Sequence, residues 1–195
     1  MKRADVVVHP LTRDRWPDLV KLFGAHGACG GCWCMWWRRP GAEFSRGKGA
    51  ENRAALRRVV AVGPPPGLLA YAGEEPIGWI ALAPREKYSK LGRSRVLKPV
   101  DDRPVWSLTC FFVARHHRRK GVTVRLLRSA VAFAREQGAR VLEGYPIDVG
   151  DRTSPDVWVY TGLLPAFHKA GFREVARRSK SRPIMRRAIQ SRAER

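Results

Sequence analysis

The alternation of apolar and polar residues is clearest between residues 105 and 134. Residues 105–113 form a short apolar run rich in β-branched and aromatic side chains, which is typical of a buried strand. A basic turn follows, after which apolar residues recur at helical spacing: Val122, Leu126, Leu127, Ala130, Val131 and Ala134. This spacing forms one apolar stripe and turns Arg125, Arg128 and Arg135 away from it. The segment therefore predicts a strand, a basic turn and an amphipathic helix.

The same reasoning predicts the remaining elements. Strands are expected at residues 4–9, 68–72, 77–83, 140–145, 172–176 and 184–189, and helices at 13–23, 50–62 and 163–169. Residues 68–72 and 77–83 should form a hairpin, and the last two strands an antiparallel pair. Long loops are expected at 25–49 and 84–103, a polar turn at 148–156 and a frayed tail at 190–195. Without a repeat or a linker, the pattern predicts one α/β (α+β) domain spanning residues 1–195.

Charge changes this picture more than composition does. The chain has 195 residues, of which 44% are hydrophobic, as in an ordinary soluble domain. Lys and Arg number 38 against 17 Asp and Glu, a net charge of +21. Such a charge raises the local concentration of anions, so phosphorylated ligands, nucleic acid and acidic surfaces are all candidate partners. A general bias toward arginine together with one anionic cofactor is an equally simple explanation.

No segment has the length or composition of a signal peptide or a membrane span. The apolar run at residues 6–8 ends at His9-Pro10, too short for a signal sequence. We therefore expect a cytoplasmic protein that has no membrane partner. In that compartment the four cysteines are expected to be thiols, with Cys110 a small buried hydrophobe.

The basic turn has the features of a phosphate site. Residues 118–123 (Arg-Arg-Lys-Gly-Val-Thr) lie between the predicted strand and the N-terminus of the predicted helix. The first N–H groups of a helix have no partner within it, and the helix dipole favours an anion there. Gly121 allows close approach of the backbone. The turn is therefore expected to bind phosphate.

Two motifs in this order resemble the GNAT acetyltransferase superfamily. Its signature of Arg or Gln, two residues, Gly, one residue, and Gly or Ala corresponds to residues 118–123, with Thr123 at the final small position. An aromatic-rich helix ending in Gly-Phe before a strand corresponds to residues 166–175. The ordered pair, within a motif-bearing core of about residues 104–189, is more specific than either motif alone.

The resemblance implies the GNAT fold, a mixed and mostly antiparallel sheet of six to seven strands flanked by about four helices. It also implies acetyl-CoA as co-substrate. Phe111, Phe112 and Val113 would offer backbone groups to the pantetheine arm, and Phe167 would also lie on the cofactor side. The pyrophosphate would be cradled by Arg118, Arg119, Lys120, Gly121, Val122 and Thr123.

The resemblance assigns the proton-transfer groups less directly. Many members have a Tyr as general acid where this chain has Phe167, which has no proton to give. Tyr160 and His168 are the candidate replacements. Some members carry a Glu in the long strand as general base, but here Ser107 is nearest to that position. Glu143 in the next strand is the remaining candidate. An alternative for Glu143 is a structural ion pair with an arginine.

A Cys/Trp segment occupies the middle of the loop at residues 25–49. His26, Cys29, Cys32 and Cys34 have a partial zinc-ligand pattern, but no second ligand pair follows them, and we assign no metal. In GNAT folds this segment overlies the acceptor site, so Cys32, Trp33, Cys34, Trp36 and Trp37 would form an aromatic acceptor wall with Arg38 as an anion anchor. Aromatic side chains covering the sheet edge are an equal alternative.

Together these observations predict an acetyl-CoA-dependent N-acetyltransferase acting on a primary amine by direct attack. The acceptor would be a small molecule or a peptide, and a homodimer is left open. One alternative is a CoA-binding regulatory module without catalysis. The other is an acetyltransferase for an RNA-linked or ribosomal substrate, a less favoured reading that draws on Lys87, Lys90, Arg93, Arg95 and Lys98.

Overall fold

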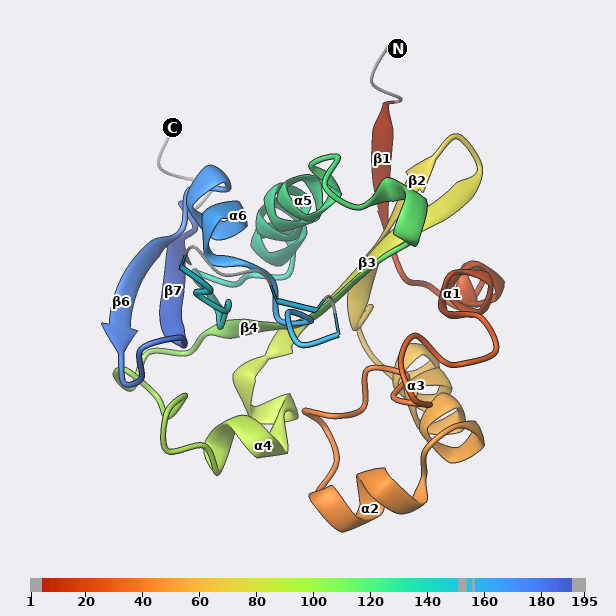
Figure 1. The fold of residues 1–195 in the computed structure, drawn as a ribbon, viewed down its shortest axis with the longest axis horizontal. Coiled ribbons are helices and arrows are strands. Elements are labelled where there is room, and N and C mark those ends of the chain that lie inside the picture. The colour runs from red at the N-terminus through yellow and green to blue at the C-terminus, as the bar shows by residue number, and fades with distance from the viewer. Residues whose placement is uncertain (1–4, 151–153, 156, 191–195) are drawn as a thin grey trace.

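A computed structural model describes residues 5–150, 154–155 and 157–190. Within these residues, seven strands form one sheet in the order β1-β2-β3-β4-β5-β7-β6 (Figure 1). The strands are β1 (Val6–Pro10), β2 (Gly67–Ala72), β3 (Glu75–Pro84), β4 (Trp106–Val113), β5 (Val141–Gly144), β6 (Arg173–Arg177) and β7 (Pro183–Ala188). Neighbouring strands are antiparallel except β4 and β5, which run parallel.

Helices cover both faces of the sheet. The α-helices of the described residues are α1 (Trp16–Phe23), α2 (Gly41–Arg46), α3 (Ala50–Val62), α4 (Ser89–Gly92), α5 (Val122–Glu136) and α6 (Leu164–Lys169). Single 3-10 turns, η1 (Arg85–Lys87) and η2 (Arg115–His117), follow β3 and β4. Helices α5 and α6 lie on one face, and α1 and α3 on the other (Figure 1). The predicted sheet size is confirmed, and the short helices α2 and α4 add to the four that were expected.

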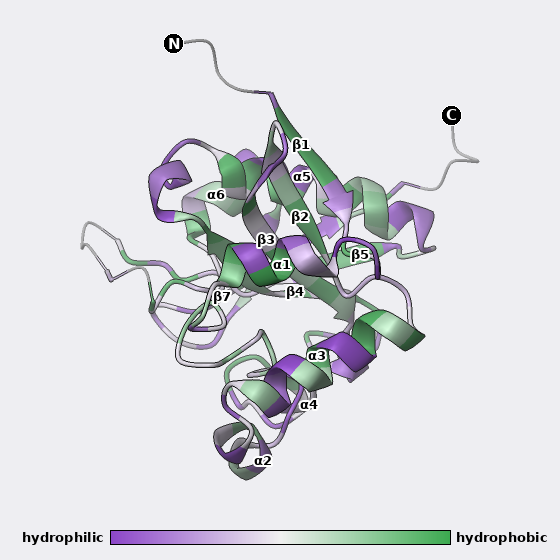
Figure 2. Cartoon of the chain, turned by 90° about the vertical axis from the view of Figure 1, so that its right-hand side faces the viewer, coloured by the Kyte–Doolittle hydropathy of each residue, from purple (hydrophilic) through white to green (hydrophobic). Residues whose placement is uncertain are grey.

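Alternation along the strands divides the core between the two faces. In β2, Leu68 and Ala70 pack with α5, whereas Leu69 and Tyr71 pack with α1 and α3. A third cluster, around Tyr88, joins the segment after β3 to Tyr145 and Ile184. Figure 2 shows the central strands in hydrophobic colours, with α3 mixing hydrophobic and hydrophilic residues. The stripe predicted for α5 is confirmed, since its six apolar positions are all buried.

Most predicted elements agree with the structure in type and position. The predicted helix at 50–62 coincides with α3, and the hairpin of β2 and β3 turns at Gly73, whose φ is 59°. The loop predicted at 25–49 was wrong in one respect, because it contains α2. The helix predicted at 13–23 begins at Trp16, and its N-terminus has no side-chain cap. The expected tail at 190–195 lies outside the described residues except for Gln190.

The parallel strands β4 and β5 diverge after three residue pairs. Trp106, Ser107 and Leu108 pair with Leu142, Glu143 and Gly144, and β4 then continues without β5 as a neighbour. Tyr160 lies in the resulting gap, where the N–H of Phe111 donates to its carbonyl at 2.6 Å. This divergence places the C-terminal half of β4 and Tyr160 side by side.

Candidate active site

A cleft of about 490 Å³ opens at the divergence of β4 and β5. Three groups of residues line it: the end of β4, the basic turn with the first residues of α5, and residues of the 149–169 region that include Tyr160. Of the predicted cofactor residues, the lining includes Phe111, Phe112, Val113, Arg118, Arg119, Gly121, Val122 and Thr123. The basic turn and Ala166 and Lys169 of the Gly-Phe signature, more than forty positions apart in the sequence, therefore meet around one cavity.

The basic turn is shaped to receive an anion. Arg119 and Gly121 both have left-handed backbones, with φ of 60° and 84°, and Gly121 is the N-cap of α5 without a side-chain cap hydrogen bond. The first N–H groups of α5 are therefore not occupied by a cap. Arg118 ties the turn to β4, because its Nε donates to the carbonyl of Val113 at 2.9 Å. A Cβ on Gly121 would meet nothing within 4 Å, so open space lies above the turn.

These features fit a pyrophosphate group. Phosphate oxygens accept hydrogen bonds from uncapped helix N–H groups and from arginines such as Arg118 and Arg119, and the helix dipole adds a favourable field. Lys120 is exposed and lies outside the cleft lining, so the turn approaches the cavity chiefly through its arginines and backbone.

The end of β4 offers fewer backbone groups than the sequence suggested. Ala114 donates to Ile77 of β3, and Phe112 pairs with Trp79, so the even-numbered residues hydrogen-bond toward β3. Phe111 and Val113 face the cleft, but the Phe111 N–H is already used by Tyr160. This leaves the Val113 N–H as the backbone donor on the cleft side.

Phe167 supports the cleft from beneath. It is completely buried, it is absent from the lining, and its ring packs edge-to-face on Phe111 at 6.0 Å and on Phe172 at 5.2 Å. Gly144 and Gly162 make room for it, since a Cβ at either position would collide with its ring. Its contribution to the cofactor side is therefore packing.

Tyr160 stands where the cleft meets the Cys/Trp segment. It lines the cleft, and its ring also packs against the core clusters that contain Trp33 and Trp37. Burial, reinforced by the Cys110 and Cys32 thiols, raises the pKa of Tyr160 to about 12, while Arg182 and the Trp36 indole act in the opposite direction. The phenol is therefore protonated at neutral pH, with two groups nearby that stabilise its ionised form.

His168 occupies a different position. It is an exposed residue of α6 and does not line the cleft, although its neighbour Lys169 does. It lies near Asp148 and Glu174, whose pKa values are lowered chiefly by hydrogen bonds from Arg177 and only slightly by His168. The two candidate replacements for the missing Tyr are thus separated, and only Tyr160 reaches the cavity.

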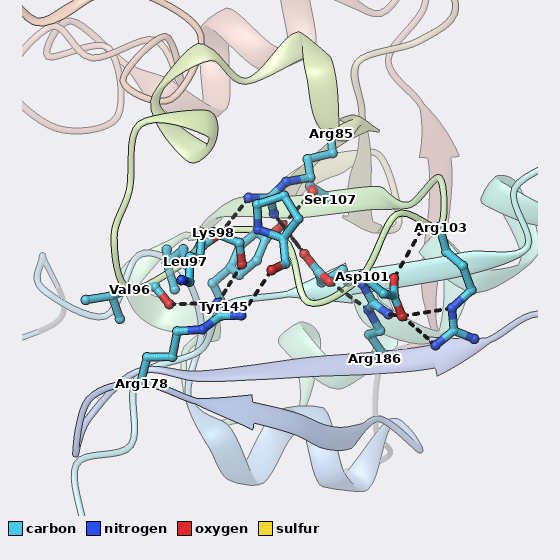
Figure 3. A network of polar contacts seen from close by, with 12 residues as sticks. Arg85, Val96, Leu97, Lys98, Asp101, Arg103, Ser107, Tyr145, Arg178 and Arg186 are labelled. Atoms are coloured by element: carbon cyan, nitrogen blue, oxygen red, sulfur yellow. Dashed lines mark hydrogen bonds and ion pairs between the residues drawn. The ribbon is translucent and has the colours of Figure 1, made fainter.

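Glu143 lies in a buried polar network instead of the cleft. Its partners Arg85, Tyr145 and Arg186 are labelled in Figure 3. Its Oε1 accepts from Arg85 at 2.9 Å and from the Tyr145 hydroxyl at 2.7 Å, and its Oε2 accepts from Arg186 at 2.7 Å. The carboxylate is 0% exposed. With both oxygens occupied and no route to the cavity, Glu143 fits the structural alternative, an ion pair, and we do not propose it as the base.

The same network fixes the basic loop between β3 and β4. Arg85 donates to the carbonyl of Leu97 at 2.6 Å, and Arg186 pairs with Asp101 at 2.7 Å. Arg178, in the β6–β7 turn, donates to the carbonyls of Lys98 and Pro99 (Figure 3). Residues that are distant in sequence thereby hold the loop against the sheet.

Replacing Glu143 tests this structural role. Glu143→Ala leaves Arg85 and Arg186 buried without their shared carboxylate, so we expect the free energy of unfolding to fall by about 3–5 kcal/mol. Glu174→Ala, which removes an exposed ion pair with Arg177, should cost at most about 1 kcal/mol. Urea denaturation of both variants measures the difference, and equal small effects would contradict the assignment.

The predicted acceptor wall is divided by the structure. Trp33 is buried and stacks on Trp16 with ring centroids 6.0 Å apart, and Trp37 and Cys34 are also buried. Trp36 is 39% exposed and Cys32 half-buried, so these two are the predicted wall residues at the surface. The segment therefore contributes both to the core and to the surface beside Tyr160.

The thiols of this segment lie in different surroundings, with Cys29 exposed, Cys32 half-buried and Cys34 buried. No group of three or more His, Cys, Asp or Glu side chains lies in ligating positions within the described ranges. Cys34 lies instead with its Sγ 3.1 Å from Cys110 Sγ and accepts from the Trp79 indole at 3.1 Å. Burial first, and then the neighbouring Cys34, raise the pKa of Cys32 to about 11, which keeps it a thiol.

Two cations of the acceptor side are arranged differently from the sequence prediction. The Lys90 ammonium is buried, 3.0 Å from the centroid of the Trp36 ring, so it is not part of an exposed basic loop. Arg38 lies over the Tyr88 ring, 4.6 Å from its centroid. The remaining members of that loop, Lys87, Arg93, Arg95 and Lys98, are exposed.

Comparison with known proteins identifies the family. The sequence model of the acetyltransferase (GNAT) family matches residues 32–147, more than half of the chain. The chain belongs to the GNAT acetyltransferase family. It is accordingly an acetyltransferase, and acetyl-CoA is its co-substrate. No curated protein sequence is similar enough to be matched.

Solved structures share the fold of this GNAT protein at low sequence identity. The PaiA N-acetyltransferase from Thermoplasma acidophilum in complex with coenzyme A has a TM-score of 0.52 and 14% identity, covering 94% of this chain and 99% of that one. AAC(6')-Ib in complex with paromomycin and acetyl-CoA has a TM-score of 0.54 and 16% identity, covering 97% of this chain and 97% of that one. The NatC complex bound to Gag peptide and CoA has a TM-score of 0.54 and 12% identity, covering 95% of this chain and 99% of that one.

No helix among the described residues is both long and apolar enough to cross a bilayer.

Proposed function

We propose that this GNAT protein is an N-acetyltransferase that transfers the acetyl group directly to a primary amine. The observation that carries the proposal is the position of Tyr160. Its backbone carbonyl accepts a hydrogen bond from the N–H of Phe111 where β4 and β5 diverge. Its side chain lines the cleft and also packs against the Cys/Trp segment. A proton donor therefore stands between the cofactor cleft and the surface from which an acceptor would approach.

The cofactor residues follow from the cleft. Arg118, Arg119 and the N-terminus of α5 would hold the pyrophosphate, and the Val113 N–H would donate to the pantetheine arm. Acetyl-CoA supplies the acetyl group as a thioester. Direct transfer requires the chain to hold the acceptor amine against this thioester, with no covalent bond to the protein.

Tyr160 would act as general acid. Its hydroxyl proton passes to the departing sulfur, which leaves as the thiol of CoA, and the phenolate is stabilised by Arg182 and the Trp36 indole. The amine nitrogen loses one proton as the amide forms. No carboxylate lines the cleft within the described part of the chain, so we propose that water accepts this proton and returns one to the phenolate.

Release of free thiol from acetyl-CoA tests the proposal. The purified full chain is incubated with acetyl-CoA and a panel of primary amines, and thiol is followed with a chromogenic disulfide reagent. Amine-dependent release with formation of the N-acetyl product supports the proposal. Tight CoA binding without release from any amine would instead support a regulatory module that binds CoA.

A further inference from the structure

Three arginines of the β6–β7 hairpin have carboxylate or carbonyl partners for their guanidinium groups. Arg177 pairs with Glu174 at 2.7 Å and Asp148 at 2.8 Å. Arg186 is shared by two carboxylates, and Arg178 donates to backbone carbonyls. In this hairpin the charge or the N–H donors of these guanidinium groups are therefore matched by carboxylates or backbone carbonyls.

Arg182 is the exception. Its guanidinium makes one hydrogen bond, from Nη1 to Thr161 Oγ1 at 3.1 Å, and no carboxylate of the described residues lies within ion-pair distance. A guanidinium has five N–H donors, and a buried charge is normally paired. Burial lowers the pKa of Arg182, against which only Tyr160 acts. Arg182 is half-buried, and most of its donors have no partner among the described residues.

The position of Arg182 relates this charge to the acceptor. Thr161, its partner, is the residue after Tyr160, and Arg182 and Tyr160 each influence the ionisation of the other. The turn that carries Arg182 is held in place, because the carbonyl of Ser181 accepts from the N–H of Asp148 at 3.0 Å. A cation therefore stands beside the proposed proton donor.

We infer that Arg182 binds an anionic group of the acceptor, so that the substrate is an amine that also carries a carboxylate or a phosphate. Either group would accept two parallel N–H bonds from the guanidinium. The inference rests on the proposed N-acetyltransferase function and narrows its substrate class. The net charge of +21 fits it, since the field of the protein attracts anionic substrates and repels polyamines and other polycations.

Matched pairs of acceptors test the inference. α-Amino acids are compared with their primary amides, and phosphorylated amino alcohols with the free amino alcohols, using thiol release by the full chain. We expect one anionic member to exceed its neutral partner by at least about tenfold in kcat/KM. The pair that shows the preference distinguishes a carboxylate from a phosphate.

Variants assign the preference to Arg182. Arg182→Met should raise the KM for the anionic member by about tenfold or more and leave the KM for the neutral member nearly unchanged. Any loss of phenolate stabilisation should lower kcat for both members alike, and Arg182→Lys should restore part of the preference. Arg173→Met makes the same replacement at an exposed residue of the same hairpin and should behave as the wild type. Calorimetric titration of the CoA-bound protein with the N-acetylated anionic products gives a second readout that does not require turnover.

The outcomes separate the two proposals. Acetyl transfer to neutral amines, with no preference for an anion and no selective effect of Arg182→Met on the KM of the anionic member, would overturn the inference and leave the proposed function standing. Absence of transfer to every amine contradicts the proposed function, and the titration then decides whether Arg182 binds the anion. Failure of the anionic products to bind, together with the absence of any preference, overturns the inference.

Discussion

Gly121→Glu should abolish useful binding of acetyl-CoA by this protein, raising its dissociation constant by at least about a hundredfold. Gly121 is the N-cap of α5 and faces open space at the basic turn. A carboxylate there would stand where the pyrophosphate is proposed to lie, and it would also satisfy the helix N–H groups and Arg119 itself. Calorimetric titration with acetyl-CoA measures the effect.

The control for this variant is Gly121→Gln. Gly121 has a φ of 84°, so any larger side chain costs about 1–2 kcal/mol of backbone strain. Glutamine matches glutamate in size and in this strain but has no charge. We expect Gly121→Gln to bind acetyl-CoA far better than Gly121→Glu. Equal, near-normal affinities for both variants would sink the assignment of the phosphate site.

The basic turn and α5 could be predicted because their signals are local. The helix begins at Val122 because apolar residues recur at helical spacing from there, and Gly121 before it has the left-handed backbone that glycine favours. The helix α3 was equally clear. By contrast, α2 has six residues, of which only Phe44 is buried, so its sequence has no helical periodicity to detect.

The parts of the site that sequence could not supply depend on contacts between distant residues. Glu143 in an apolar strand suggests either a raised pKa or an ion pair, and its partners Arg85 and Arg186 lie 58 and 43 positions away. Among 38 basic residues, nothing local selects these two, nor distinguishes Arg182 from the other arginines of its turn. The Cys/Trp segment is similar, because Trp33 and Trp36 have the same chemistry and only packing sets their burial.

Tyr160→Phe should lower kcat for acetyl transfer by about a hundredfold or more, the usual contribution of a general acid. The ring fills the same space, so the contacts with the cleft and the Cys/Trp segment are retained and acetyl-CoA should bind as before. The loss should therefore appear in kcat, with little change in the dissociation constant of acetyl-CoA. Steady-state thiol release and calorimetry measure the two quantities.

His168→Gln is the matched control, because His168 was the other candidate acid and lies outside the cleft lining. Its kcat should stay within about twofold of the wild type, since a surface side chain outside the cavity contributes no proton. The pH profile adds a second test. With a pKa of about 12, Tyr160 stays protonated across the neutral range. The rate should therefore show no decrease between neutral and moderately alkaline pH that is due to ionisation of Tyr160. A Tyr160→Phe variant with wild-type kcat, or a His168→Gln variant with the larger loss, would move the proton donor away from the junction of the cleft and the Cys/Trp segment.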